Sequence, residues 1–362
     1  MEHGRIALYV PRFCTIIILL LNFSLRPFAA EGEAELLKAA TGAFNDKFYS
    51  RAEEQFAEFA AKFPASTNLP QAILYQAQAR HFQKEHDAAI DLLRANSAKA
   101  GELADQYVFT SADALAAKGD QAAAAEHYAR ILKEFPSSPL RLQAAYLQAF
   151  SYFQLKEYPR TIELLRNPEG EFRKLAAANP QGRFTFAGGL LLVDTLLATG
   201  QLDDARAVAT ALAPPADRPE LQWERHDALA RIEFASATPL AALPHFTNAL
   251  TVAETALLPR LQAQSWNLAA EAYKKVGQTN GAIAAYEKIA AMDPLPIDQR
   301  RLAMLKTVEL FSLSGNLTNA IGRLESYLAG TTNEPAADLL RVKACDLWID
   351  QARNLSRQGN SG

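Results

Sequence analysis

The residues that could do chemistry are few and scattered along the chain. The histidines are His3, His81, His86, His127, His226 and His245. His81 and His86 are five residues apart, a spacing that on one helix turns two side chains away from each other, so we do not expect them to share a metal. Glu224, His226 and Asp227 are interpreted as a solvated helix face rather than a catalytic cluster. Phosphate loops, dinucleotide fingerprints, nucleophile elbows and paired-cysteine motifs are absent from the sequence. We therefore expect a protein that is not an enzyme, with no catalytic residues, metal or cofactor.

The N-terminus has the pattern of a secretory signal peptide. Arg5 and Arg12 precede the apolar stretch Phe13–Leu25, and small residues follow up to Ala30. The apolar stretch is shorter than the ~20 residues of a spanning helix. We expect residues 1–30 to be a signal peptide and the mature protein not to span a membrane. An uncleaved anchor and an incorrectly assigned start remain alternatives.

Charge and cysteine content narrow the partners and the compartment. The chain has 37 Lys and Arg, 40 Asp and Glu and a net charge of −3; loss of residues 1–30 removes three basic residues and one acidic residue, leaving −5. A chain of this charge is not expected to bind nucleic acid. Cys345 would be the one cysteine left, so no intramolecular disulfide could form. An exported protein without disulfides indicates a bacterial periplasm or cell envelope.

Small residues recur along the chain at a period of about 35 to 44 residues. Eight of them mark one position of the repeat: Ala52, Ala89, Ala124, Thr161, Ala205, Ala242, Ala282 and Ala320. Eight others lie twelve residues before these: Ala40, Ala77, Ala112, Ala149, Val193, Ala230, Ala270 and Val308. Two small positions per repeat predict two closely packed helices in each repeat, which is typical of an α-solenoid.

The seventh repeat is the clearest, and its pattern resembles the tetratricopeptide repeat. Its signature residues are Trp266, Ala270, Tyr273, Ala282, Tyr286 and Pro294. The first, third and fourth repeats match in part, and the resemblance covers roughly residues 33–327. It implies an all-α solenoid of about eight helix-turn-helix repeats over residues 31–332. A capping helix over 333–357 and a disordered tail over 358–362 are expected to follow.

Three local features refine the expected repeat. Gly119, Gly200, Gly277 and Gly315 occupy the turn between the two helices of their repeats, and Lys47, Lys84 and Lys156 occupy the same position in others. Glycine suits the left-handed end of a helix, and a cation there is mildly favourable. Pro244 predicts a kinked or delayed second helix in the sixth repeat. The longest spacing leaves room for an extra helical turn or a short third helix within Glu169–Asn179.

The resemblance also implies a groove lined by the first helices of the repeats. The positions it assigns to that groove include Phe109, Asp113, Tyr146, Phe150, Phe153 and Asp194. Tyr146, Phe150 and Phe153 form one stripe on a helix, and we predict that they anchor a protein or peptide partner. The alternative is that further packing covers these aromatic residues. Asp227, Arg231, Asn267, Glu271 and Glu309 would make the groove polar further along.

Together these features predict an exported, non-enzymatic scaffold that binds a protein or peptide partner in cell-envelope assembly or secretion. The alternative is a helical accessory domain of a peptidoglycan- or polysaccharide-processing enzyme complex. A third, weaker interpretation is direct glycan binding through the aromatic stripe.

Overall fold

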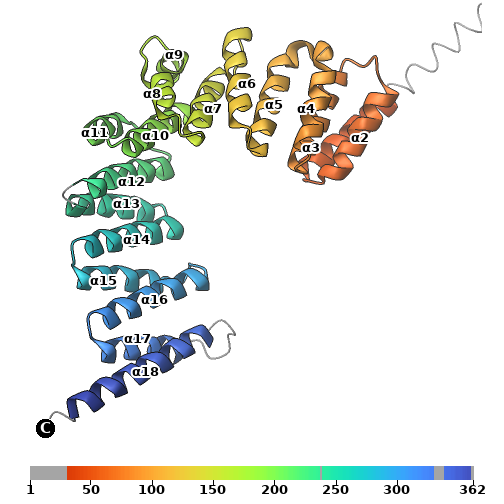
Figure 1. The fold of residues 1–362 in the computed structure, drawn as a ribbon. Coiled ribbons are helices and arrows are strands. Elements are labelled where there is room, and N and C mark those ends of the chain that lie inside the picture. Colours follow the sequence, from red (N-terminus) through yellow and green to blue (C-terminus); the bar gives the residue numbers. More distant parts are fainter. Residues whose placement is uncertain (1–30, 237–238, 330–337, 360–362) are drawn as a thin grey trace, which may run out of the picture. The chain divides into compact units, whose positions relative to one another are not determined.

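The computed structural model describes residues 31–236, 239–329 and 338–359. The expected signal peptide, residues 1–30, lies outside this part of the chain. The chain divides into two units, Met1–Arg160 and Thr161–Gly362, called here the N-terminal and C-terminal units. All regular elements among the described residues are helices (Figure 1), which confirms the all-α prediction.

The N-terminal unit is a series of helices joined by short turns. Residues 31–45 form its first helix. The others are α2 (Tyr49–Lys62), α3 (Leu69–Phe82), α4 (His86–Ala95), the short η1 (Ser97–Lys99) and η2 (Gly101–Leu103), α5 (Ala104–Lys118), α6 (Gln121–Glu134), α7 (Arg141–Gln154) and α8 (Tyr158–Arg166), within which the division between the units falls.

The C-terminal unit continues the same pattern. Its helices are α9 (Glu171–Ala178), α10 (Arg183–Ala198), α11 (Leu202–Ala211), α12 (Pro219–Ala235), η3 (Pro239–Ala242), α13 (Leu243–Thr255), α14 (Pro259–Lys275), α15 (Thr279–Ala290), α16 (Ile297–Leu313), α17 (Leu317–Ala329) and α18 (Asp338–Gly359). With the first helix, these elements form the eight predicted helix pairs, with α9 inserted after the fourth pair and α18 following the eighth.

The small residues that define the repeat form the contacts between paired helices. All sixteen positions, from Ala40 and Ala52 in the first repeat to Val308 and Ala320 in the eighth, are 0% exposed. Helices approach closely only where no large side chain separates them, and interiors at native density have no room for added methylenes. These positions therefore fix the frame of the array.

The turn between the helices of a repeat has one backbone geometry in seven repeats. The residue after the first helix has positive φ: Lys47 (63°), Lys84 (68°), Gly119 (97°), Lys156 (61°), Gly200 (75°), Gly277 (75°) and Gly315 (77°). The amide of the next residue bonds back to a helix carbonyl, as in Asp120 N to Leu115 O at 2.9 Å and Glu85 N to Arg80 O at 2.9 Å. This is the Schellman end of a helix. The three lysines thus adopt the left-handed conformation, which glycine adopts more easily. This backbone conformation defines the position, whatever their charge contributes.

Two irregularities lie where the sequence places them. In the sixth repeat the second helix begins with η3, and Pro244 is then the second residue of α13, so this helix is delayed as predicted. The extra segment after the fourth repeat contains α9, a short third helix.

α18 packs on the last repeat along one face. Leu340, Ala344 and Leu347 are buried in the same cluster as Leu324 of α17. The helix continues to Gly359, two residues into the predicted tail 358–362, whose last three residues lie outside the described part of the chain. The boundary between solenoid and cap, predicted at residues 332 and 333, also lies outside it.

Candidate binding surface

An aromatic row runs along α7 in the N-terminal unit. The ring centroids of Tyr146 and Phe150 are 6.1 Å apart and those of Phe150 and Phe153 are 6.5 Å apart, with planes within 26° and 22° of parallel. Tyr158, at the start of α8, continues the row 5.7 Å from Phe153. Phe150 and Phe153 are half-buried, while Ala145 and Ala149 of the same helix are buried. The row is therefore distinct from the buried face of α7 and keeps part of its ring surface at solvent.

Phe109 and Asp113 lie together on α5, one repeat earlier, and both contact Tyr128 of α6. The ring of Phe109 meets that of Tyr128 edge-on at 5.7 Å. The Tyr128 hydroxyl donates to Asp113 Oδ1 at 2.5 Å. Burial raises the pKa of Asp113, and the hydrogen bond from Tyr128 offsets part of that rise. Asp113 thus has a partner within its own repeat.

Asp194, on α10 of the C-terminal unit, belongs to an ion-pair network. Arg231 Nη1 lies 2.6 Å from Asp194 Oδ1, and its Nε lies 2.8 Å from Asp227 Oδ2. Asp227 is buried, and its Oδ1 has no hydrogen-bond partner among the described residues. Burial raises the pKa of Asp227, although Arg231 acts in the opposite direction. This network makes the first helices of the fifth and sixth repeats polar, as the sequence predicts.

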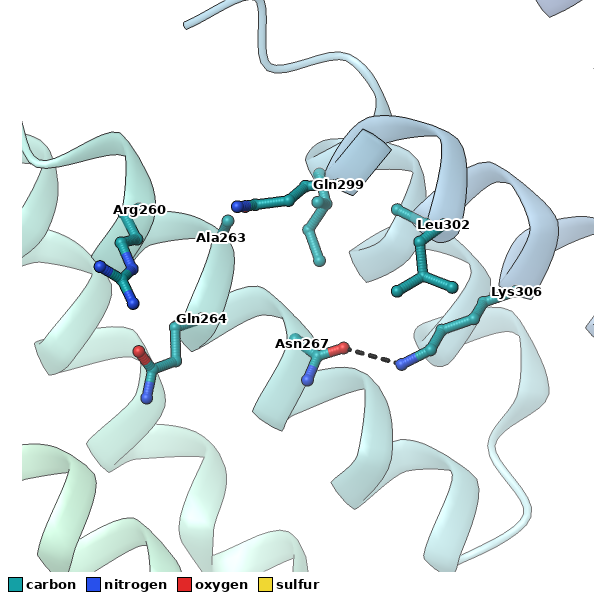
Figure 2. A pocket seen from close by; sticks show the side chains of 9 residues that line it. Arg260, Ala263, Gln264, Asn267, Gln299, Leu302 and Lys306 are labelled. Atoms are coloured by element: carbon teal, nitrogen blue, oxygen red, sulfur yellow. Dashed lines mark hydrogen bonds between the residues drawn. The ribbon is translucent and has the colours of Figure 1, made fainter. Parts of the chain in front are cut away.

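A pocket of about 300 Å³ opens between α14 and α16 of the C-terminal unit. Figure 2 shows Arg260, Gln264 and Asn267 along α14, with Leu302 and Lys306 of α16 on the other side. Its apolar floor is formed by Ala263, Ile289 and Ala303, which are all buried.

The cations of this pocket differ in how they are held. Lys306 Nζ donates to Asn267 Oδ1 at 3.1 Å and lies 3.7 Å from Glu271 Oε1. Arg260 has no hydrogen bond or ion pair among the described residues. The pocket therefore offers an apolar floor with a free guanidinium at its edge, which suits a short acidic or polar side chain.

Comparison with known proteins agrees with this architecture. A family model described as the tetratricopeptide repeat matches residues 108–138, which span most of α5 and all of α6. The C-terminal part of a TPR repeat-containing protein from Cytophaga hutchinsonii has a similar structure, with a TM-score of 0.51 at 16% identity, covering 73% of this chain and 97% of that one. The family model thus matches one repeat of this chain, and the structural similarity shows a helical-repeat fold.

Two other solved structures are similar to this chain. One is a tetratricopeptide repeat protein from Parabacteroides merdae, with a TM-score of 0.48 at 15% identity, covering 76% of this chain and 99% of that one. The other is a Rap protein complexed with the competence and sporulation factor, with a TM-score of 0.45 at 14% identity, covering 89% and 99% of the two chains. No curated protein matches the sequence.

One expectation about the histidines is wrong. His81 and His86 come together: their Nδ1 atoms are 3.2 Å apart. The helix ends at Phe82, and the left-handed Lys84 reverses the chain before α4 begins at His86, so the spacing along one continuous helix does not apply. Burial and the neighbouring His86 lower the pKa of His81. The described residues contain no group of three or more His, Cys, Asp or Glu side chains able to hold a metal.

Sequence reasoning found part of this surface and missed part of it. The aromatic stripe and the polar residues Asp227, Asn267 and Glu271 were visible at groove positions of the repeat. Arg260, Lys306 and the pocket between them were not predicted. Gln264 and Leu302 occupy groove positions of successive repeats, and that shared register is the signal that could have located the pocket. None of the helices among the described residues has the length and apolar character needed to cross a bilayer.

Proposed function

We propose that this protein is an exported, non-enzymatic scaffold of the cell envelope whose first helices bind a segment of a protein partner. Tetratricopeptide arrays generally present such a face to proteins or peptides, and the chain shares their repeat and fold. The proposed role is to hold partners together during envelope assembly or secretion.

The observation that carries the proposal is the half-buried aromatic row of α7. Phe150 and Phe153 stack on one another away from the buried alanines of their helix. Aromatic rings with accessible surface are the side chains that most often anchor protein interfaces, because they bury a large area at a small cost in conformational entropy. In the N-terminal unit we therefore expect apolar or aromatic anchors of the partner to dock on this row.

The C-terminal unit supports a complementary preference. Arg260 has no ion pair with any residue in the described part of the chain, and Lys306 lies across the same pocket, above an apolar floor. A carboxylate on a short side chain would accept hydrogen bonds from these cations while its methylenes contact Ala263 and Ile289. We expect the bound segment at this unit to contain an acidic residue.

Selection from a displayed random-peptide library on the purified protein tests this proposal. Wild-type protein should enrich peptides with aromatic or large apolar anchors, or with an acidic residue. Phe150→Ala should lose the first class, and the double variant Arg260→Ala, Lys306→Ala should lose the second. Phe48→Ala removes an exposed phenylalanine outside the proposed surface and is the matched control. Enrichment that no variant changes would contradict the proposal.

Export is a separate part of the proposal and has its own test. The basic start and the short apolar stretch before Ala30 support it. N-terminal sequencing of the protein from an envelope fraction should give a start between Ala29 and Glu33. Recovery from the cytoplasm with Met1 intact would contradict export without affecting the proposed binding surface.

A further inference from the structure

The inserted helix α9 breaks the repeat of the C-terminal unit and docks on α10. Phe172 and Ala176 of α9 are buried. Gly188 lies in the interior of α10, and a Cβ at that position would lie 2.1 Å from Phe172 Cζ. A Cβ at the adjacent Gly189 would lie 2.4 Å from Leu212 Cδ2. Each glycine inside a helix costs about 1 kcal/mol relative to alanine. The pair therefore has a packing role: it lets these two side chains lie directly on the α10 backbone.

This arrangement leaves a cavity between α8, α9, α10 and α11. Its volume is about 590 Å³, against 300 Å³ for the pocket of Figure 2. The walls are mainly apolar: Leu165, Phe172, Ala176, Phe186, Leu192, Val208, Ala211 and Leu212. A cavity of this size is in the range of small-molecule sites in proteins.

The charged side chains that line this cavity are both basic. Among the described residues that line it, the charged ones are Arg166 and Arg173, and none is acidic. Arg166 is paired with Asp204 at 2.8 Å, whereas Arg173 is exposed and has no ion-pair partner among the described residues. Gln181 and Thr185 add polar groups to the lining. The cavity thus combines an apolar interior with a free guanidinium.

We propose that this cavity binds an amphiphile with a single aliphatic chain and an anionic headgroup, of the class of a fatty-acid carboxylate. The aliphatic chain would lie against Phe172, Phe186 and Leu212, where burial of apolar surface drives binding. The carboxylate would accept hydrogen bonds from Arg173. An apolar tail alone would leave the Arg173 guanidinium without a partner, and a cationic head would be repelled by Arg173. This site is separate from the proposed peptide-binding surface and does not depend on it.

Calorimetric titration of the full-length protein with dodecanoate, below its micelle concentration, tests the proposal. Dodecanol and dodecyltrimethylammonium have the same chain with a neutral and a cationic head. We expect dodecanoate to bind about tenfold more tightly than dodecanol, which corresponds to one charge-assisted contact, and the cationic amphiphile to bind weakest.

Three variants locate the binding. Ala211→Phe fills the cavity from an exposed position on α11 and should abolish binding, while Thr210→Phe, exposed on the same helix but outside the lining, should leave it unchanged. Arg173→Glu should weaken dodecanoate at least tenfold and dodecanol little. The fold of each variant is checked by its helical circular dichroism and unfolding midpoint.

Several results would overturn the proposal. They are the absence of dodecanoate binding, equal affinity for the anionic and cationic amphiphiles, or full binding by Ala211→Phe. Binding of an apolar peptide at this cavity in place of dodecanoate would also overturn it and would make the cavity a side-chain pocket for a protein partner. None of these results bears on Phe150, so failure here is distinguishable from failure of the proposed function.

Discussion

The third and seventh repeats contain the same hydrogen-bonded pair, a tyrosine and a carboxylate, in two different surroundings. In each, a tyrosine of the second helix donates to a carboxylate of the first helix fifteen residues earlier: Tyr128 to Asp113 and Tyr286 to Glu271. Both tyrosines are buried, and each follows the small residue of its helix by four positions. The two repeats thus share both backbone frame and polar contact.

The neighbours of the two carboxylates differ. Asp113 lies beside Phe109, and burial raises its pKa with no cation opposing the rise. Burial also acts to raise the pKa of Glu271, but the Tyr286 hydroxyl, Lys274 and Lys306 outweigh it, so this pKa is lowered. Lys274 Nζ is 3.0 Å and Lys306 Nζ 3.7 Å from the carboxylate. One repeat frame therefore supports an aromatic surface in the N-terminal unit and a charged one in the C-terminal unit.

If both units share one repeat frame, enlarging its small residues should lower the free energy of unfolding by equal and large amounts in the two units. Ala124→Leu and Ala282→Leu should each lower the free energy of unfolding by up to about 3 kcal/mol, because both positions are fully buried between helices. Ala122→Leu and Ala284→Leu, exposed on the same helices, are the controls and should change it by less than about 0.5 kcal/mol. Urea unfolding measures all four; equal losses at buried and exposed positions would contradict the frame.

Removing the tyrosine hydroxyl should destabilise the protein by different amounts in the two repeats. Tyr128→Phe leaves the half-buried Asp113 without its donor and should lower the free energy of unfolding by about 2 kcal/mol. Tyr286→Phe should have about half that effect, because Glu271 keeps its two lysines. Chemical denaturation of both variants makes the comparison, and a larger loss for Tyr286→Phe would show that the lysines do not compensate.

Replacing the two carboxylates by neutral isosteres should change the free energy of unfolding in opposite directions at pH 7. Asp113→Asn keeps an acceptor for Tyr128 and removes a half-buried charge without a cation, so stability should rise by up to about 1 kcal/mol. Glu271→Gln loses its ion pairs and should lower stability by up to about 1 kcal/mol. Thermal and urea unfolding give both signs.

The pH dependence of these two variants provides a second readout. The folded-state pKa of Asp113 is raised, so ionisation of this carboxyl group destabilises the folded protein as pH rises above 3.8. The stability advantage of Asp113→Asn should therefore grow over the same pH range. The folded-state pKa of Glu271 is lowered, so its contribution is complete above 4.5 and is lost as pH falls; the deficit of Glu271→Gln should shrink in acid. Parallel pH profiles for the two variants would contradict the assigned surroundings.

The smallest expected effects are in the turns, where the units also differ. The three lysine turns, Lys47, Lys84 and Lys156, belong to the N-terminal unit, and the described turns within repeats of the C-terminal unit have glycine; the left-handed Leu257 (φ 55°) lies between two repeats of that unit. Lys84→Gly should stabilise the protein by about 0.5–1 kcal/mol, and Gly277→Lys should destabilise it by a similar amount, because side chains with a Cβ disfavour the left-handed conformation. Differential scanning calorimetry measures both shifts; a loss of stability in Lys84→Gly would mean that lysine charge dominates at this turn.

The sequence was sufficient for the repeat frame because that frame depends on local size and periodicity. Ala270 and Ala282 are small for a reason visible in the spacing itself, and Pro244 delays its helix through its own covalent structure. Contacts across turns were harder to predict from the sequence. His81 and His86 meet because the chain reverses at Lys84, and this requires a backbone angle that lysine seldom adopts.

The site was only partly predictable because it depends on which side chains are already engaged. Asp113 and Asp194 were assigned to the groove by register, but their hydrogen-bonded partners Tyr128 and Arg231 come from other helices. The cavity beside α9 depends on Gly188 and Gly189, whose purpose appears only when Phe172 and Leu212 are placed against them. Non-local packing of this kind has no signature in repeat spacing.

The central claim is that the aromatic row of α7 binds a partner. The most direct test measures, for Phe150→Ala, both the unfolding midpoint and the affinity for a peptide selected on the wild-type protein. We predict a loss of affinity of more than about 30-fold, equivalent to about 2 kcal/mol, with an unfolding midpoint near that of wild type. A core aromatic residue would instead cost about 3–5 kcal/mol of stability on truncation to alanine. Unchanged affinity, or a loss of affinity that only accompanies a large fall in the midpoint, would contradict the claim.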